Sequence, residues 1–136
     1  MSTGVVYSAI KSFLDANWSD TPLVYENTNE PIADDPSDFI YVEISGNSYG
    51  RASIGSPDNN LWRENGLLWF HIMIPSGEGS LGARTYAESL IELLRDQQLL
   101  SGKLTFQEAS VGLGEPGDEN GNYWRLSMSV DWVLDT

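Results

Sequence analysis

The chain has 136 residues, of which 40% are hydrophobic and 20% are charged, and it contains no cysteine. This composition is that of one ordinary globular domain over residues 1–136, and it excludes disulfides, thiolate metal sites and a membrane-spanning segment. Twenty acidic residues against seven basic ones give a net charge of −13, which excludes tight binding to nucleic acid because a phosphate backbone is repelled. The first residues lack the basic and apolar parts of a signal peptide, so we expect synthesis in a bacterial host's cytoplasm.

The first part of the chain predicts one helix and two strands. Apolar residues at helical spacing over 3–16 predict an amphipathic helix. Residues 23–25 form a short extended run, and the polar, proline-containing segment 27–38 is a connection. Residues 39–44 alternate with the period of two that is typical of a strand with one covered face.

The middle of the chain predicts a loop, a strand and a second helix. Residues 45–60 hold three glycines and one proline, so we expect a mobile hairpin loop. Residues 61–74 are apolar at both parities, which predicts a central strand covered on both faces, ending at Pro75. Helical spacing then runs from Ser80, the expected N-cap, to about Gln98.

The last part predicts two strands around an acidic loop. Residues 103–111 are typical of a strand, 112–122 of a second flexible loop, and 124–135 of a long, half-buried strand. The order is therefore helix, strand, strand, strand, helix, strand, strand. We predict an α+β fold with a mixed or antiparallel sheet of about five strands and two helices packed on one face.

Residues 77–82, Gly-Glu-Gly-Ser-Leu-Gly, have the glycine spacing that wraps a dinucleotide's pyrophosphate. That fingerprint belongs to the first strand-to-helix turn of a repeating strand-helix-strand array, whereas here three strands precede it. Glu78 would face the phosphate, and no acidic residue occupies the place that holds the ribose. We interpret the glycines as a tight turn and expect no cofactor.

His71 is the only histidine and lies within the most apolar strand. A general base needs a nucleophile and an open face, and a zinc site needs several converging ligands; the sequence indicates neither. Residues 114–120 could bind calcium loosely, although the pattern favours a solvated acidic turn. We predict no catalytic residue and no metal site. A small-molecule-binding or hydrolytic domain that uses His71 with a carboxylate is the alternative from a different functional class.

Five tryptophans and a small set of arginines are the candidate interface residues, because aromatic and arginine side chains concentrate at protein interfaces. Arg63 and Arg125 lie at strand beginnings among acidic loops. In a chain with only seven basic groups, each could bridge to carboxylates of a neighbouring copy.

The element order, together with Tyr25-Glu26-Asn27, Arg63-Glu64-Asn65-Gly66 and the run 74–79, resembles the small tail-terminator and tail-completion proteins of tailed phages. These include the minor tail protein U class of lambda-like phages and related phage-associated domains of unknown function. The resemblance covers about residues 3–134 and brings no catalytic motif. It implies an α/β domain that closes into a hexameric ring, caps the tail tube, halts its polymerisation and presents a surface to the head-neck connector.

The expected partners are thus other copies of the chain, the tail-tube protein and the head-tail connector protein, with DNA passing through the ring without tight binding. We expect a location at the neck end of the tail of a phage, prophage or gene transfer agent, and no membrane contact. Repulsion between copies must be offset by specific contacts. The candidate interface residues are Arg51, Arg63, Arg84, Arg125, Asp58, Glu115, Asp118 and Glu119. A head-tail joining protein or a tail-tube protein is the alternative of similar build.

Overall fold

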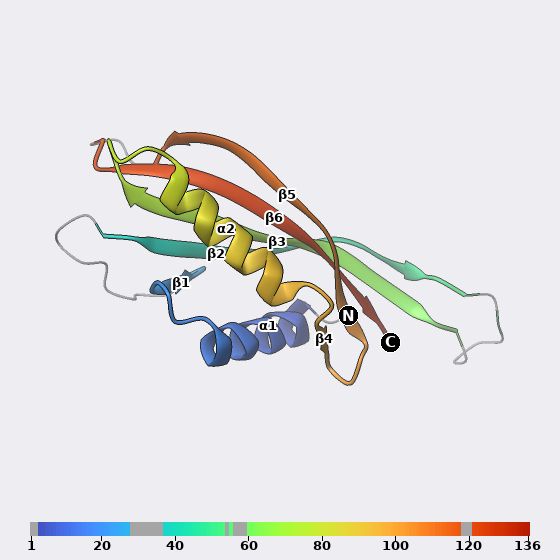
Figure 1. Ribbon diagram of the computed structural model, residues 1–136. Coiled ribbons are helices and arrows are strands. Elements are labelled where there is room, and N and C mark those ends of the chain that lie inside the picture. Colours follow the sequence, from blue (N-terminus) through green and yellow to red (C-terminus); the bar gives the residue numbers. More distant parts are fainter. Residues whose placement is uncertain (1–2, 28–36, 54, 56–59, 118–120) are drawn as a thin grey trace.

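The structure is a computed structural model that describes residues 3–27, 37–53, 55, 60–117 and 121–136. Two helices and six strands follow one another along the chain (Figure 1). In chain order they are α1 (Thr3–Asn17), β1 (Leu23–Tyr25), β2 (Phe39–Arg51), β3 (Trp62–Pro75), α2 (Leu81–Leu94), β4 (Gln98–Leu99), β5 (Leu104–Pro116) and β6 (Tyr123–Asp135).

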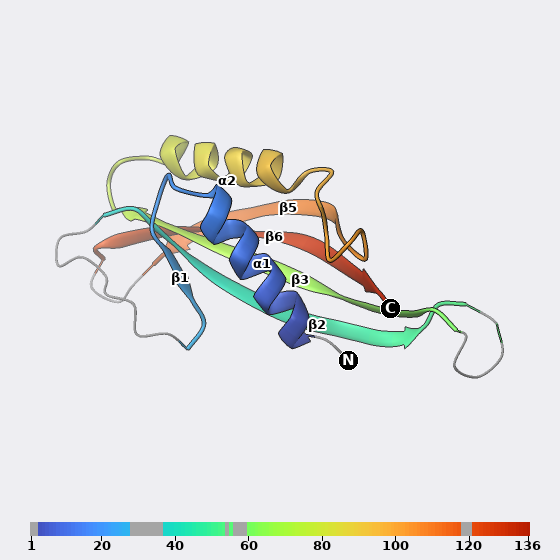
Figure 2. The ribbon, with the colours of Figure 1, turned by 90° about the horizontal axis from the view of Figure 1, so that it is seen from below.

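The strands form one sheet in the order β1-β2-β3-β6-β5-β4. β1 pairs with β2 in parallel, and the four other neighbouring pairs are antiparallel. Both helices lie on the same face of this sheet (Figure 2). The predicted α+β fold is confirmed, with the two-residue strand β4 as an addition.

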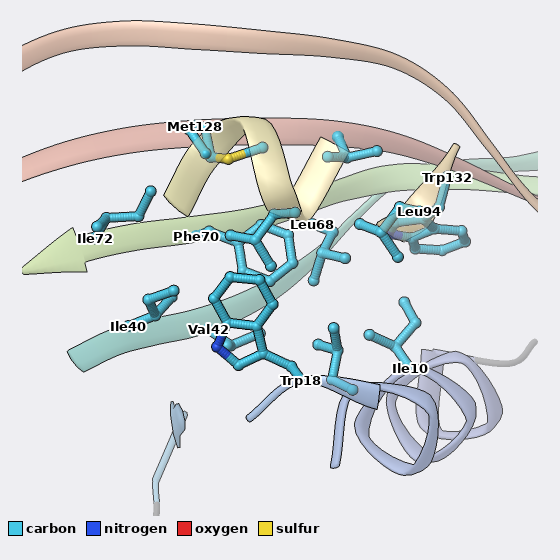
Figure 3. Packing of buried hydrophobic residues seen from close by; sticks show 14 of the residues in the cluster. Ile10, Trp18, Ile40, Val42, Leu68, Phe70, Ile72, Leu94, Met128 and Trp132 are labelled. Atoms are coloured by element: carbon cyan, nitrogen blue, oxygen red, sulfur yellow. The ribbon is translucent and has the colours of Figure 1, made fainter. Parts of the chain in front are cut away.

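The covered face, meaning the sheet face under the helices, holds the core because apolar residues alternate along the long strands. Val42, Phe70 and Met128 lie side by side on β2, β3 and β6 and are fully buried. Helix α1 adds Ile10, and α2 adds Leu94, both fully buried (Figure 3). Burial of such side chains, at about 1.5–3 kcal/mol each, holds the two helices on the sheet.

The opposite side of the sheet, which we call the open face, differs from the sequence-based expectation for β3. β3 is a central strand as predicted, between β2 and β6. However, the described elements cover only one of its faces, and Leu67, Trp69 and His71 are half-buried on the other. The apolar residues of this face pack against their neighbours within the sheet. A small cluster of Val24, Phe39 and Met73 lies at one end of it.

The hairpin of β2 and β3 is longer than the sequence predicts. Residues 45–51 were expected in a loop, yet strand pairing continues past a bulge between Gly46 and Ser48 to the pair Arg51 and Trp62. The prediction was wrong there because backbone pairing does not need an apolar face, and the residues of this extension are mostly exposed. The paired extension projects beyond the rest of the sheet (Figure 1).

Two other boundaries also differ. β5 continues to Pro116, beyond the expected end at residue 111, and its register opposite β6 shifts between Phe106 and Ala109 and again between Val111 and Gly114. Gly114 permits this continuation, since a Cβ there would lie 1.6 Å from an atom of the Trp124 ring. Helix α2 ends at Leu94 instead of Gln98, because Arg95 turns to extended backbone and Asp96 takes a φ of 62°.

Candidate interaction surfaces

The projecting end of the β2–β3 hairpin, residues 48–53 and 60–65, is called the arm below. Ser48 Oγ donates to Asn65 Oδ1 at 2.8 Å near its base, and the backbone pair Ala52 and Leu61 closes its outer part. The backbone of Trp62 exchanges two hydrogen bonds with Thr136 at 2.8 and 2.9 Å. The arm is therefore fastened to the end of the chain as well as to the sheet.

The arm presents large apolar side chains to solvent. Tyr49 is 42% exposed, Leu61 38% and Trp62 40%. The rings of Tyr49 and Trp62 stack with centroids 5.4 Å apart and planes 15° apart. Such side chains are costly in water and are typical of contact surfaces between proteins.

Four arginines were predicted at an interface, and the structure gives three of them contacts within the chain. Arg63 binds Asp135 with two hydrogen bonds of 2.7 and 3.0 Å, and Arg125 pairs with Glu115 across β5 and β6. Arg84 Nε donates to Ser80 Oγ at 3.1 Å. Arg51 is exposed on the arm and makes no ion pair within the described residues.

The predicted interface residues do not form one cluster. Arg51 and Arg63 lie at the arm, whereas Glu115 and Arg125 lie at the other end of the sheet. Asp58, Asp118 and Glu119 are outside the described residues. The contact with Asp135 raises the pKa of Arg63, and the hydrogen bond from Arg63 holds the pKa of Asp135 below its ordinary range.

His71 lies on the open face between a serine and a carboxylate. Its Nε2 lies 2.7 Å from Glu43 Oε1, and its Nδ1 lies 2.7 Å from Ser127 Oγ. The Tyr41 and Trp69 rings flank it, with centroids 6.1 and 6.0 Å away. Burial, followed by the charges of nearby carboxylates, raises the pKa of Tyr41.

This line contains a serine, a histidine and an acid, but its geometry differs from that of the serine hydrolases. In their triad Nε2 faces the serine and Nδ1 faces the acid, whereas here the two nitrogens are exchanged. These contacts give both ring nitrogens of His71 a partner, on a sheet face that carries polar and apolar side chains. Sequence reasoning named His71 but missed Glu43 and Ser127, because only strand register brings these residues together.

The glycine-rich segment 77–82 forms the turn from β3 into α2. Gly77 and Gly79 have φ values of 90° and 77°, and a Cβ on either would meet nothing within 4 Å. Backbone conformation, and not close approach of a phosphate, thus explains the two glycines. Ser80 is the N-cap residue as predicted, although its side chain makes no capping hydrogen bond.

A groove lies between the end of α2 and β5, which we call the α2–β5 groove. It encloses a cavity of about 200 Å³, lined among others by Ile91, Leu94, Arg95, Asp96, Phe106 and Val130. β4 pairs only with the first two residues of β5, and no other described strand pairs with that edge. The groove is therefore open at the side of the sheet opposite β1 and β2.

In the part of the chain that the structure describes, no group of three or more histidine or carboxylate side chains is placed to share a metal ion. None of the helices in these ranges is both long enough and apolar enough to cross a membrane.

Comparison with protein families finds one matching model, described as phage tail terminator protein, over residues 5–132. No curated protein matches the chain significantly. Among solved structures, a protein without a functional description is 18% identical with a TM-score of 0.69, over 98% of this chain and 96% of that one. A chain from the virion of a native gene transfer agent particle is 15% identical with a TM-score of 0.55, over 99% of this chain and 100% of that one.

Proposed function

The chain belongs to the phage tail terminator family, and we propose that it caps the tail tube of a tailed phage, a prophage or a gene transfer agent. It stops polymerisation of the tube and joins the tail to the head-neck connector, as a ring for which we expect six copies. The observation that carries this proposal is the family match over residues 5–132. The protein works at the neck end of the tail through surface complementarity, without a catalytic step.

Charge supports the proposed passage of DNA through the ring. The net charge of −13 repels phosphate, so a DNA strand that moves past many copies meets no strongly attractive surface. The same charge opposes association of the copies. Apolar contacts and the few arginines must therefore bring neighbouring copies together.

A mixing experiment tests the capping function. The tail tubes come from the particle whose structural genes lie next to the gene for this chain. They are extended in vitro with free tube protein, with and without the purified chain. We expect electron microscopy to show that the chain halts growth at one tube end and forms a ring there. Continued growth at both ends would contradict capping.

Electron microscopy of the purified chain alone tests the tail-tube alternative. A tail-tube protein forms long tubes without a partner, whereas a terminator stops at monomers or single rings. Long tubes formed by the purified chain alone would therefore replace the terminator function with that of a tube protein.

A further inference from the structure

Exposed apolar side chains are concentrated on the arm. Seven large hydrophobic side chains are exposed within the described residues, and three of them, Tyr49, Leu61 and Trp62, belong to this one hairpin end. Arg51 lies directly opposite Trp62 in the strand register. Tryptophan, tyrosine and arginine are the residue types that supply most of the binding energy at protein interfaces. This combination indicates that the arm binds another protein.

The α2–β5 groove is suited to a side chain more than to a metabolite. Pockets for small molecules enclose about 300–1,000 Å³, whereas this cavity encloses about 200 Å³. Its apolar wall includes Leu94, Phe106 and Val130. A cavity of this size, open at the side of the sheet, fits an anchoring side chain from another protein.

The arm and the groove are different surfaces that lie on either side of β6. The arm extends from β2 and β3, while the groove borders β5, with β6 between them in the strand order. The arm leads outward past the end of the sheet, away from its own groove (Figure 1). Contact between two different surfaces of identical chains generates a closed ring when the rotation between copies closes.

The charges of the two surfaces are complementary. The arm carries the exposed guanidinium of Arg51. Beside the groove, Asp96 lines the cavity, and the exposed Glu92 and Glu108 follow lining residues in the sequence, against the single cation Arg95. In a chain with seven basic residues and twenty acidic ones, the positive charge of Arg51 on the arm is complementary to the acidic rim of the groove.

We propose that the arm of one copy binds in the α2–β5 groove of the next copy, with Trp62 as the anchor, Leu61 at the edge of the groove and Arg51 facing the acidic rim. This contact rests on the proposed ring assembly and names its interface. It also gives the ring a direction, because every copy donates one arm and receives one.

Disulfide crosslinking tests the contact, since the chain has no cysteine of its own. One variant carries Leu61→Cys on the arm and Gln107→Cys at the groove. The matched control carries Leu61→Cys with Ser8→Cys, at an exposed position on α1. We expect oxidation to link the first variant into covalent dimers up to closed rings, and to leave the control unlinked. Purified protein, alone and at tube ends, is analysed by denaturing electrophoresis and electron microscopy.

A second measurement uses truncation of the anchor. Trp62→Ala should weaken ring assembly by at least about tenfold in concentration, as measured by sedimentation. Leu81→Ala, which truncates a side chain that is 79% exposed on α2, should leave assembly unchanged. Circular dichroism checks that both variants are folded.

The possible results distinguish failure of the contact between arm and groove from failure of ring formation. Rings that form without the 61–107 crosslink, or that tolerate Trp62→Ala, would overturn the contact and leave the proposed function intact. Absence of any ring, both in solution and at tube ends, would overturn the assembly itself and the contact with it.

Discussion

The two faces of the sheet are made by the same strands, yet they are built differently. On the covered face Val42, Phe70 and Met128 form an apolar row under the helices, while the residues next to them in the sequence, Glu43, His71 and Ser127, form a hydrogen-bonded line on the open face. The covered face supplies stability by burial. The open face satisfies its polar groups pairwise. Residues at alternate positions of the same strands therefore form the core, and the residues between them face the surroundings of the sheet.

The largest expected loss of stability comes from a substitution on the covered face. Phe70→Ala should lower the free energy of unfolding by about 3–5 kcal/mol, because it removes a fully buried ring from between two strands and two helices. Trp69→Ala, its neighbour on the open face, should cost roughly half as much, since Trp69 is only half-buried. Urea denaturation measures both. Equal losses would contradict the division between the faces.

Gly66 tests how closely the covered face is packed at the base of the arm. A Cβ at this position would lie 1.9 Å from the carbonyl oxygen of Ser45 and 2.6 Å from the Trp132 ring. Gly66→Ala should therefore destabilise the fold by about 1–3 kcal/mol, as measured by thermal denaturation. The control is Gly50→Ala on the arm, where a Cβ meets nothing within 4 Å. A neutral Gly66→Ala would show that β2 and β3 can move apart.

A smaller effect is expected on the open face. His71→Ala removes hydrogen bonds to Glu43 and Ser127 and should cost about 1 kcal/mol, because Glu43 is partly exposed and such bonds contribute little net energy. Tube capping should be unchanged in this variant. Hydrolysis of a test ester by the purified chain, abolished by His71→Ala, would instead favour the hydrolytic alternative.

The smallest effect concerns the titration of two carboxyl groups. The hydrogen bond from Lys11 holds the pKa of Asp15, on α1, below its ordinary value, and that from Arg63 does the same for Asp135. A lowered pKa stabilises the fold above the unfolded value, and this contribution is lost as the pH falls through the folded value. Carboxyl NMR titration should show both shifts. Arg63→Gln should restore the pKa of Asp135 alone, and an unchanged midpoint would contradict the pairing.

The sequence predicted the fold well where apolar residues alternate. The helices at the start and middle of the chain, the first half of β2 and the long β6 follow from periodicity, because burial requires that pattern, whereas the central β3 was predicted from its apolar residues at both parities. The extensions of β2 and β5 could not be predicted in this way. Their residues are glycine-rich and mostly polar, and what holds them in strands is pairing with β3 and β6.

The candidate contact residues were predicted only in part. Arginines stood out because the chain is acidic, and the sequence marked Arg51 and Arg63, which lie on the arm. It did not indicate that Leu61 and Trp62 are exposed, because they adjoin an apolar run that otherwise points into the core. The groove was beyond sequence reasoning, since it joins residues of α2 to residues of β5 and β6.

The register shifts of β5 have a consequence for how the chain behaves before it meets a partner. Bulged strands bend and expose an uneven row of amide groups, which makes them poor templates for growth of a fibril. Leu113 is 90% exposed on this strand. Removing one residue at a register shift is expected to give β5 a regular edge, to which a strand from another molecule can pair more readily.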